Sequence, residues 1–204
     1  MPKNSKCKLI VFAGFLSCWG FDGMHEGLFL GAAGGLSILS SRYYSPDFTY
    51  SWQPTEFGVV GGLEVGYGIT PLTLISSRWR INYIGHSGIT GWINRYNSRG
   101  AIELNRFISD HSPIQAGLGL GYTTFYTWIT SEKETGYQGT GPTGFGIGPC
   151  AVANLAYEAS RRIGMRFDMS VGTIDFSYRS IDGTEVETAL LLITSELTIQ
   201  FRIY

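Results

Sequence analysis

The chain has 204 residues, of which 28 are glycine and only 15% are charged, and its formal net charge is −1. This length allows one domain or at most two, and the near-zero charge gives no support for a nucleic-acid-binding surface. Glycine is about twice as frequent as the ~7% of an average protein, and charge is well below the usual ~25%. An ordinary soluble surface is therefore not expected.

The N-terminus has the order of a secretory signal peptide. Three lysines and no acidic residue precede an apolar run that begins at Leu9, and small residues follow the run. The run is shorter than the ~20 apolar residues of a membrane-spanning helix, and its flanks are those of an exported precursor. We predict a signal peptide at residues 1–20 and one domain at residues 21–204. The alternatives are an ordinary N-terminal helix or strand, and lipid modification of Cys18.

Lysine is nearly absent from the predicted mature chain. Residues 21–204 contain one lysine and eleven arginines against sixteen acidic residues, a net charge of −4. Soluble proteins usually carry lysine over their surfaces, so this exterior needs another explanation. Cys150 is the one cysteine certain to remain, which excludes an intramolecular disulfide framework.

Eight segments have the period-two alternation of β-strands, and no segment has a convincing helical period. The predicted strands are residues 27–40, 57–68, 72–84, 100–108, 114–128, 144–157, 163–176 and 188–204.

The connections between these segments alternate in length. Long ones are predicted at residues 41–56, 85–99, 129–143 and 177–187, and short ones near Thr70 and at residues 109–113 and 158–162. Strict alternation places all long connections at one end of an up-and-down sheet, as in outer-membrane barrels with short periplasmic turns. We therefore predict an all-β fold, an eight-stranded antiparallel up-and-down transmembrane β-barrel.

One face of each predicted strand is polar. In the third strand, for example, Arg78 and Arg80 alternate with Trp79 and Ile81. Arginine suits enclosed ion pairs because its planar fork meets a carboxylate with two hydrogen bonds. An eight-stranded barrel has an interior just wide enough to be filled by side chains. We predict a charge network in the lumen, formed by Glu64, Arg78, Arg80, Glu103, Arg166, Asp168, Glu196 and Arg202.

The other face of each strand is apolar and is predicted to contact lipid. Monomeric soluble proteins avoid such a large exposed apolar surface, whereas a closed barrel in a bilayer requires it. Aromatic side chains concentrate at membrane interfaces, and Phe176, near the loop end of its strand, is interpreted in the same way. Residues predicted to face lipid or its interface include Trp79, Tyr83, Tyr122, Trp128, Phe167 and Phe201. The alternatives are a soluble lipid-binding barrel and a two-sheet sandwich, which predict a charged, lysine-bearing exterior.

Three stretches, "GLFLGAAGGLSILSS", "FGVVGGLEVGYGITPLTLISSRWRINYIGHSG" and "SRGAIELNRFISDHSPIQAGLGLGY", carry a family resemblance. They resemble the small outer-membrane β-barrel domain family common in Bacteroidetes-type bacteria, which includes PorT-like and OmpX-like proteins. The family usually has a proline where Asn105 stands, and its terminal aromatic falls on the apolar side, where Phe201 lies and Tyr204 does not. The resemblance implies location in the outer membrane and recognition of the last strand by the outer-membrane assembly machinery.

The sequence offers little catalytic chemistry. His86 and Ser87 lie in a predicted loop and lack the His-x-Ser-Asn pattern of the lipid A deacylases, and the other histidines have no metal-ligand spacing. We expect a non-enzymatic monomer without cofactor or metal, with a lumen filled by side chains. It would act through its long extracellular loops in adhesion, surface protection or docking of a protein partner, including a place in a secretion or assembly machine. The alternatives are an outer-membrane lipid A-modifying enzyme and a soluble lipid-binding barrel.

Overall fold

The computed structural model describes residues 27–44, 55–88, 91–130, 141–179 and 185–204, and the predicted signal peptide lies outside them. These residues form eight strands: β1 (Gly27–Tyr44), β2 (Glu56–Thr70), β3 (Thr73–Gly88), β4 (Gly91–Phe107), β5 (Ile114–Thr130), β6 (Gly141–Glu158), β7 (Ile163–Arg179) and β8 (Glu185–Ile203). Within the described ranges, no helix has the length and apolar character needed to cross a membrane.

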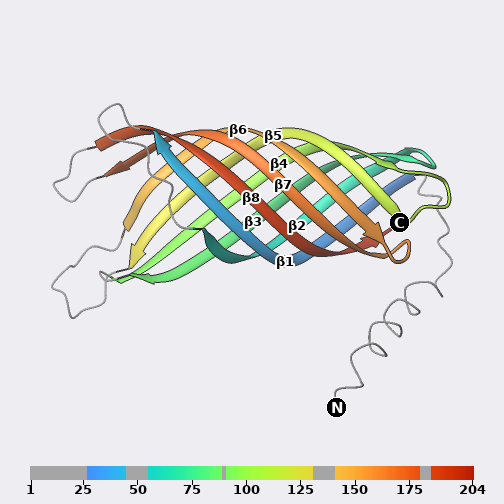
Figure 1. Ribbon diagram of the computed structural model, residues 1–204, viewed down its shortest axis with the longest axis horizontal. Coiled ribbons are helices and arrows are strands. Elements are labelled where there is room, and N and C mark those ends of the chain that lie inside the picture. Colours follow the sequence, from blue (N-terminus) through green and yellow to red (C-terminus); the bar gives the residue numbers. More distant parts are fainter. Residues whose placement is uncertain (1–26, 45–54, 89–90, 131–140, 180–184) are drawn as a thin grey trace, which may run out of the picture.

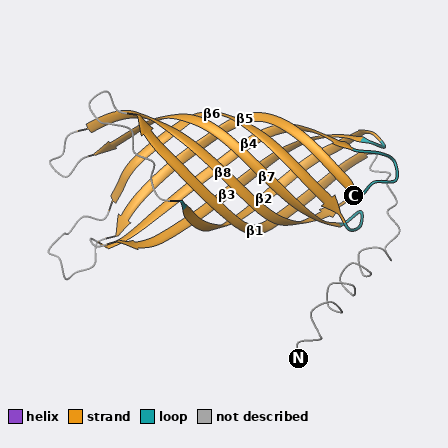
Figure 2. Cartoon of the chain, in the orientation of Figure 1, coloured by secondary structure: helices purple, strands orange, loops and turns teal. Residues whose placement is uncertain are grey.

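The strands close into one antiparallel barrel (Figures 1 and 2), because β8 pairs with β1 along fifteen residue pairs. Following paired residues from Leu30 on β1 across all eight strands leads back to β1 at Ser40. This stagger of ten residues tilts the strands against the barrel axis. The predicted fold is confirmed.

The connections define two ends of the barrel. The turn end holds the short connections at residues 71–72, 108–113 and 159–162. The loop end, at the left of Figure 1, holds the connections at residues 45–55, 89–90, 131–140 and 180–184.

The long connection predicted at residues 85–99 is wrong. β3 continues to Gly88 and β4 begins at Gly91, with Gly88 and Gly91 paired at the end of the hairpin. The "GHSG" stretch resembles a turn, but the cross-strand hydrogen bonds of the barrel extend the ladder through it. The other three loop-end connections are also shorter than predicted, because the strands before and after them are longer.

Burial alternates along every strand with a period of two. On β2, Glu64 and Val60 are buried inside the barrel, whereas Val59 and Leu63 are exposed outside. This is the alternation of the pleated strand, and here the side that is buried is the polar one. The strands described thus have most of their charged residues inside and most of their large apolar residues outside.

The interior also contains two apolar clusters that the sequence analysis did not predict. The turn-end cluster consists of Phe29, Leu74 and Phe107, with Leu72 packed against it. The loop-end cluster consists of Leu39, Ile84, Phe125, Ile174, Phe176, Leu190 and Leu192. The prediction that Phe176 lies at the membrane interface is therefore wrong, because its ring packs inside against Phe125 with 5.8 Å between ring centroids.

Candidate functional site

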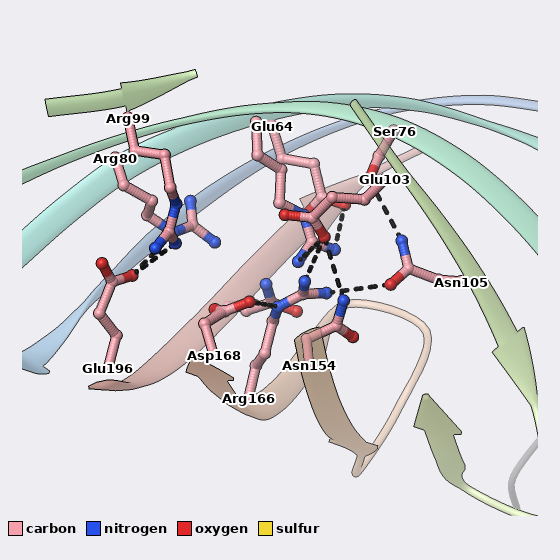
Figure 3. A network of polar contacts seen from close by, with 12 residues as sticks. Glu64, Ser76, Arg80, Arg99, Glu103, Asn105, Asn154, Arg166, Asp168 and Glu196 are labelled. Carbon is pink, nitrogen blue, oxygen red and sulfur yellow. Dashed lines mark hydrogen bonds and ion pairs between the residues drawn. The ribbon is translucent and has the colours of Figure 1, made fainter. Parts of the chain in front are cut away.

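Charged side chains fill the barrel between the two apolar clusters. The lower charge group, nearer the turn end, is built around Arg78, Arg166 and Glu103. Arg78 Nη2 donates a hydrogen bond to Glu64 Oε1 at 2.6 Å, and its Nη1 lies 3.3 Å from Glu103 Oε2. Arg166 also contacts Glu103, and its Nε donates to Asp168 Oδ1 at 2.6 Å. Glu103 thus joins Arg78 of β3 and Arg166 of β7, which come from opposite sides of the closed barrel. Figure 3 shows Arg166 reaching toward Glu103 across the lumen.

The lower charge group is closed toward the turn end by Arg202. Its guanidinium pairs with Glu158 and lies 3.7 Å from Glu64 Oε2, and its central carbon is 5.0 Å from the centroid of the Phe29 ring. An arginine over an aromatic face gains electrostatic attraction in addition to packing. The charge network is therefore continuous with the turn-end apolar cluster.

The upper charge group, nearer the loop end, is centred on Glu196. Its Oε2 accepts a hydrogen bond from Arg99 Nη2 at 3.0 Å and lies 4.0 Å from Arg80 Nε. Its Oε1 accepts a hydrogen bond from Asn82 Nδ2 at 2.9 Å. Figure 3 shows Arg80 and Arg99 both reaching across the lumen toward this one carboxylate. Glu196 is 0% exposed, so it compensates two buried cations without water around it.

Like charges are direct cross-strand neighbours in this arrangement. Arg80 pairs with Arg99 across β3 and β4, and Asp168 pairs with Glu196 across β7 and β8. Like charges placed directly opposite in a sheet repel each other. Here, Arg80 and Arg99 extend across the narrow lumen toward Asp168 and Glu196. Each like-charge pair therefore compensates the charge of the other. Gly62 leaves room for this arrangement, because a Cβ at that position would lie 2.1 Å from the carbonyl oxygen of Trp79 and 2.7 Å from Arg80 Nη1.

All eight residues of the predicted lumen network lie inside the barrel and are buried. The sequence analysis missed Arg99, which it placed in a loop, and Glu158, which it placed in a turn. It also missed the pair of Arg95 and Glu56 near the loop end. Continuing the period-two pattern of β4 back from Glu103 reaches Arg99 and Arg95, so the signal was present in the sequence. Glu158 continues the inward parity of β6 in the same way.

The outer surface is an apolar belt. On β7 it runs from Ile163 to Val171, which is about the 9–11 residues that a tilted strand needs to cross a bilayer. Beyond Val171 the outward positions become polar, with Asp175 exposed toward the loop end. The described part of β8 follows the same order, from exposed Ile203 at the turn end to exposed Glu187 at the loop end. On β7 and β8 the strands therefore extend past the belt at the loop end, whereas on β4 the exposed Arg106 interrupts the outward apolar residues near the turn end.

A charge at the middle of this belt is expected to destabilise the protein by about 2–4 kcal/mol if the belt faces lipid. Leu118 is the central outward residue of the apolar run on β5 and is 70% exposed. The Leu118→Arg variant should show that loss in urea unfolding from lipid vesicles. The matched change Ile108→Arg lies at the edge of the belt, where the cost should be only ~0–1 kcal/mol. Equal effects at the two positions would contradict a lipid-facing belt.

Five of the six aromatic residues predicted to face lipid or its interface have exposed, outward side chains. They are Trp79, Tyr83, Tyr122, Phe167 and Phe201. Trp128 belongs to β5, but its side chain lies outside the described residues.

Tyr204 lies beyond the end of β8. Its ring is about half exposed and sits 5.8 Å from the Phe29 ring, centroid to centroid, at the turn end. Tyr204 therefore adds to the apolar surface inside the barrel and not to the outer belt. This is expected, because it has the same parity as the inward, polar residues of β8.

His86 and Ser87 are strand residues and not loop residues. Their backbones pair with Ile93 and Trp92 of β4, while their side chains lie outside the described residues. Among the described residues, no group of three or more His, Cys, Asp or Glu side chains has an arrangement suited to a metal ion.

No protein-family model matches the chain, and no curated protein sequence matches it. Solved structures match its fold. The outer membrane protein OprG from Pseudomonas aeruginosa has a TM-score of 0.55 at 11% identity, covering 90% of this chain and 99% of its own. Ail, the attachment invasion locus protein of Yersinia pestis, has a TM-score of 0.53 at 12% identity, covering 87% and 99%. The outer membrane protein AlkL has a TM-score of 0.50 at 9% identity, covering 88% and 92%.

Sequence identities this low support a shared fold and do not support a shared activity. The fold and the apolar belt together define a small transmembrane β-barrel of the outer-membrane type, which agrees with the resemblance to OmpX-like proteins.

Proposed function

We propose that this protein is a non-enzymatic outer-membrane barrel with a closed lumen, which acts through the connections at its loop end. The observation that carries the proposal is the filling of the lumen. The two charge groups lie between the turn-end and loop-end apolar clusters, and the residues of all four are buried. An interior filled in this way leaves no aqueous path for general diffusion, in contrast to the wide barrels of porins.

The proposed function is exerted at the loop end of the barrel. Outer-membrane barrels have their longer connections outside the cell, and the two longest connections, at residues 45–55 and 131–140, join strands at this end. The expected roles are adhesion, surface protection or docking of a protein partner, including a PorT-like place in a secretion or assembly machine. Export through the signal peptide at residues 1–20 and delivery by the assembly machinery belong to the same proposal.

Ail illustrates that a barrel of this fold can carry a surface role. It is named for attachment and invasion, and its crystal structure in complex with the heparin analogue sucrose octasulfate has a TM-score of 0.54 to this chain. The likeness of fold makes such a role compatible with the architecture. The ligand of the present protein has to be found by experiment.

A closed lumen predicts a protein that does not conduct. The full chain, purified from outer membranes and inserted into planar lipid bilayers, should give no stable, porin-like current steps at moderate voltage. The same preparation should migrate faster unheated than boiled on a gel, which proves that the inserted protein is a folded barrel. Large, long-lived current steps from such a preparation would contradict the closed-lumen proposal.

The role of the loops is tested by exchange. Replacing residues 131–140 with a Gly-Ser linker of equal length should leave folding and outer-membrane location unchanged, because the segment connects strands beyond the belt. Adhesion of intact cells, their resistance to serum or bile salts, and proteins crosslinked to the barrel are then compared with the wild type. If exchanging the loop-end connections at residues 45–55, 131–140 and 180–184 in turn changes none of these readouts, the proposed site of action is wrong.

A further inference from the structure

One sector of the outer surface differs from the rest of the apolar belt. Tyr83, Tyr96 and Tyr126 are direct cross-strand neighbours on β3, β4 and β5. Their ring centroids are 5.1 Å apart between Tyr83 and Tyr96 and 6.5 Å apart between Tyr96 and Tyr126. The Tyr83 hydroxyl donates a hydrogen bond to Asn94 Oδ1 at 2.7 Å. The three rings form a continuous row on the lipid side, toward the loop end.

A second aromatic row lies four residues further toward the turn end on the same strands. Trp79, Gly100 and Tyr122 are cross-strand neighbours there. The Trp79 indole covers Gly100, since a Cβ on Gly100 would lie 2.9 Å from Trp79 Nε1. Trp79 and Tyr122 remain exposed. Glycine at this position thus lets the indole lie flat over the strand.

Two hydroxyl groups lie between these rows. Ser98 and Thr124 are cross-strand neighbours, and their Oγ and Oγ1 atoms are 2.7 Å apart in a hydrogen bond. We name this surface the aromatic platform, formed by Trp79, Tyr83, Tyr96, Ser98, Tyr122, Thr124 and Tyr126. The exposed apolar side chain of Ile81 lies beside Ser98 on the same surface.

The platform is polar where neighbouring sectors are aliphatic. Tyr83 pairs on its other side with Val59, which in turn pairs with Leu36, and both are exposed apolar residues. The hydrogen bond between Ser98 and Thr124 uses only one of their two hydroxyl protons. A hydroxyl proton that finds no acceptor in hydrocarbon costs free energy. Aromatic rings flanking a pair of hydroxyls within the belt therefore fit a ligand that is both amphipathic and hydroxylated, better than they fit acyl chains alone.

We propose that the aromatic platform binds the sugar headgroup of a glycolipid of the outer leaflet. The C–H faces of a pyranose ring are attracted to the electron-rich faces of aromatic rings, and its hydroxyl groups can exchange hydrogen bonds with Ser98, Thr124 and Asn94. The acyl chains would continue over Ile102 and Leu120, which are exposed and apolar toward the turn end. This assignment rests on the proposed orientation, with the loop end outside the cell.

The test is native mass spectrometry of the full mature protein released from detergent micelles, with purified lipid A or phosphatidylethanolamine added. The wild type should retain lipid A in preference to phosphatidylethanolamine. The double variant Ser98→Leu/Thr124→Val removes two hydrogen-bonding groups but keeps the surface apolar. Losing two hydrogen bonds should weaken the retention of lipid A by about fivefold to about a hundredfold.

A matched control uses Ser195, a half-buried outward residue of β8 away from the platform. The Ser195→Leu variant makes the same kind of change and should retain lipid A like the wild type. A second platform variant, Tyr96→Leu, should also lose lipid A through the loss of its ring.

Two results would overturn the glycolipid site. One is equal retention of lipid A and phosphatidylethanolamine by the wild type. The other is unchanged lipid A retention in both platform variants, which would make the platform an ordinary interface girdle. Heat-modifiable migration and the absence of conductance are measured on every variant. A wild type that conducts ions or lacks heat-modifiable migration counts against the proposed function. A wild type that passes both tests but does not prefer lipid A counts only against the glycolipid site on the platform.

Discussion

Replacing Glu196 with glutamine is expected to lower the free energy of unfolding by about 3–5 kcal/mol, the usual cost of removing one partner from a buried ion pair. Glu196 is the one carboxylate within 4.0 Å of Arg80 and Arg99 among the described residues. Glutamine keeps the shape and an acceptor for Asn82, but it leaves two adjacent buried guanidinium groups without a carboxylate within 4.0 Å in the described part of the chain. Asp168 then becomes their nearest acidic neighbour on the facing wall. Urea unfolding of the protein in lipid vesicles measures the loss.

The matched control is Glu187→Gln on the same strand. Glu187 is exposed at the loop end of β8, and surface changes of this kind usually stay within ±0.5 kcal/mol. If Glu196→Gln were as mild as Glu187→Gln, the upper charge group would not be held by this carboxylate. The double variant Glu196→Gln/Arg80→Met removes one cation as well and should recover part of the loss.

Replacing Gly35 with valine is expected to prevent closure of the barrel between β1 and β8. A Cβ on Gly35 would lie 1.9 Å from the carbonyl oxygen of Leu197 and 2.8 Å from Thr198 Cα. Both atoms belong to the backbone of β8, so no side-chain rotation relieves the clash, and the strands must separate. We expect a loss of about 3 kcal/mol or more, above the ~1–3 kcal/mol of ordinary overpacking. The folded, heat-modifiable fraction on a gel should fall sharply.

Gly61→Val is the control for that experiment. Gly61 points outward from β2, and nothing lies within 4 Å of a Cβ added there. Valine favours strands and adds apolar surface to the belt, so the variant should fold as well as the wild type. A similar defect in both variants would show that folding depends on the glycine backbone itself and not on the close approach to β8.

The number of strands and the two-sided character of the barrel could be predicted from the sequence. The period of two is a local property of the pleated chain, since neighbouring side chains point to opposite faces. The polar side of strands such as "RWRIN" is therefore visible in the residues themselves. The scarcity of lysine after residue 20 and the abundance of glycine then indicate which face is enclosed, because an enclosed, narrow lumen favours arginine and small residues.

The ends of the strands were less predictable. "GHSG" has the residues of a turn, yet His86 and Ser87 lie in β3 because the neighbouring strand supplies ladder partners. The same error hid Arg99 from the predicted network. Local turn propensity is worth little against a row of cross-strand hydrogen bonds in a barrel, where closure removes every free edge.

The sequence by itself determined the inward side of each strand where charged and apolar residues alternate, because parity along a strand is set within a few residues. Where the inward residues are apolar, as at Phe176, only the structure showed which way they face. Only the tertiary structure decided which inward residues meet. The pairing of Arg99 with Glu196 and of Arg166 with Glu103 crosses the lumen between distant strands, and it depends on the ten-residue stagger that sets their relative heights. The loop-end apolar cluster arises in the same way: Leu39, Phe125 and Leu190 are far apart in the chain and meet because the closed barrel brings them to one level.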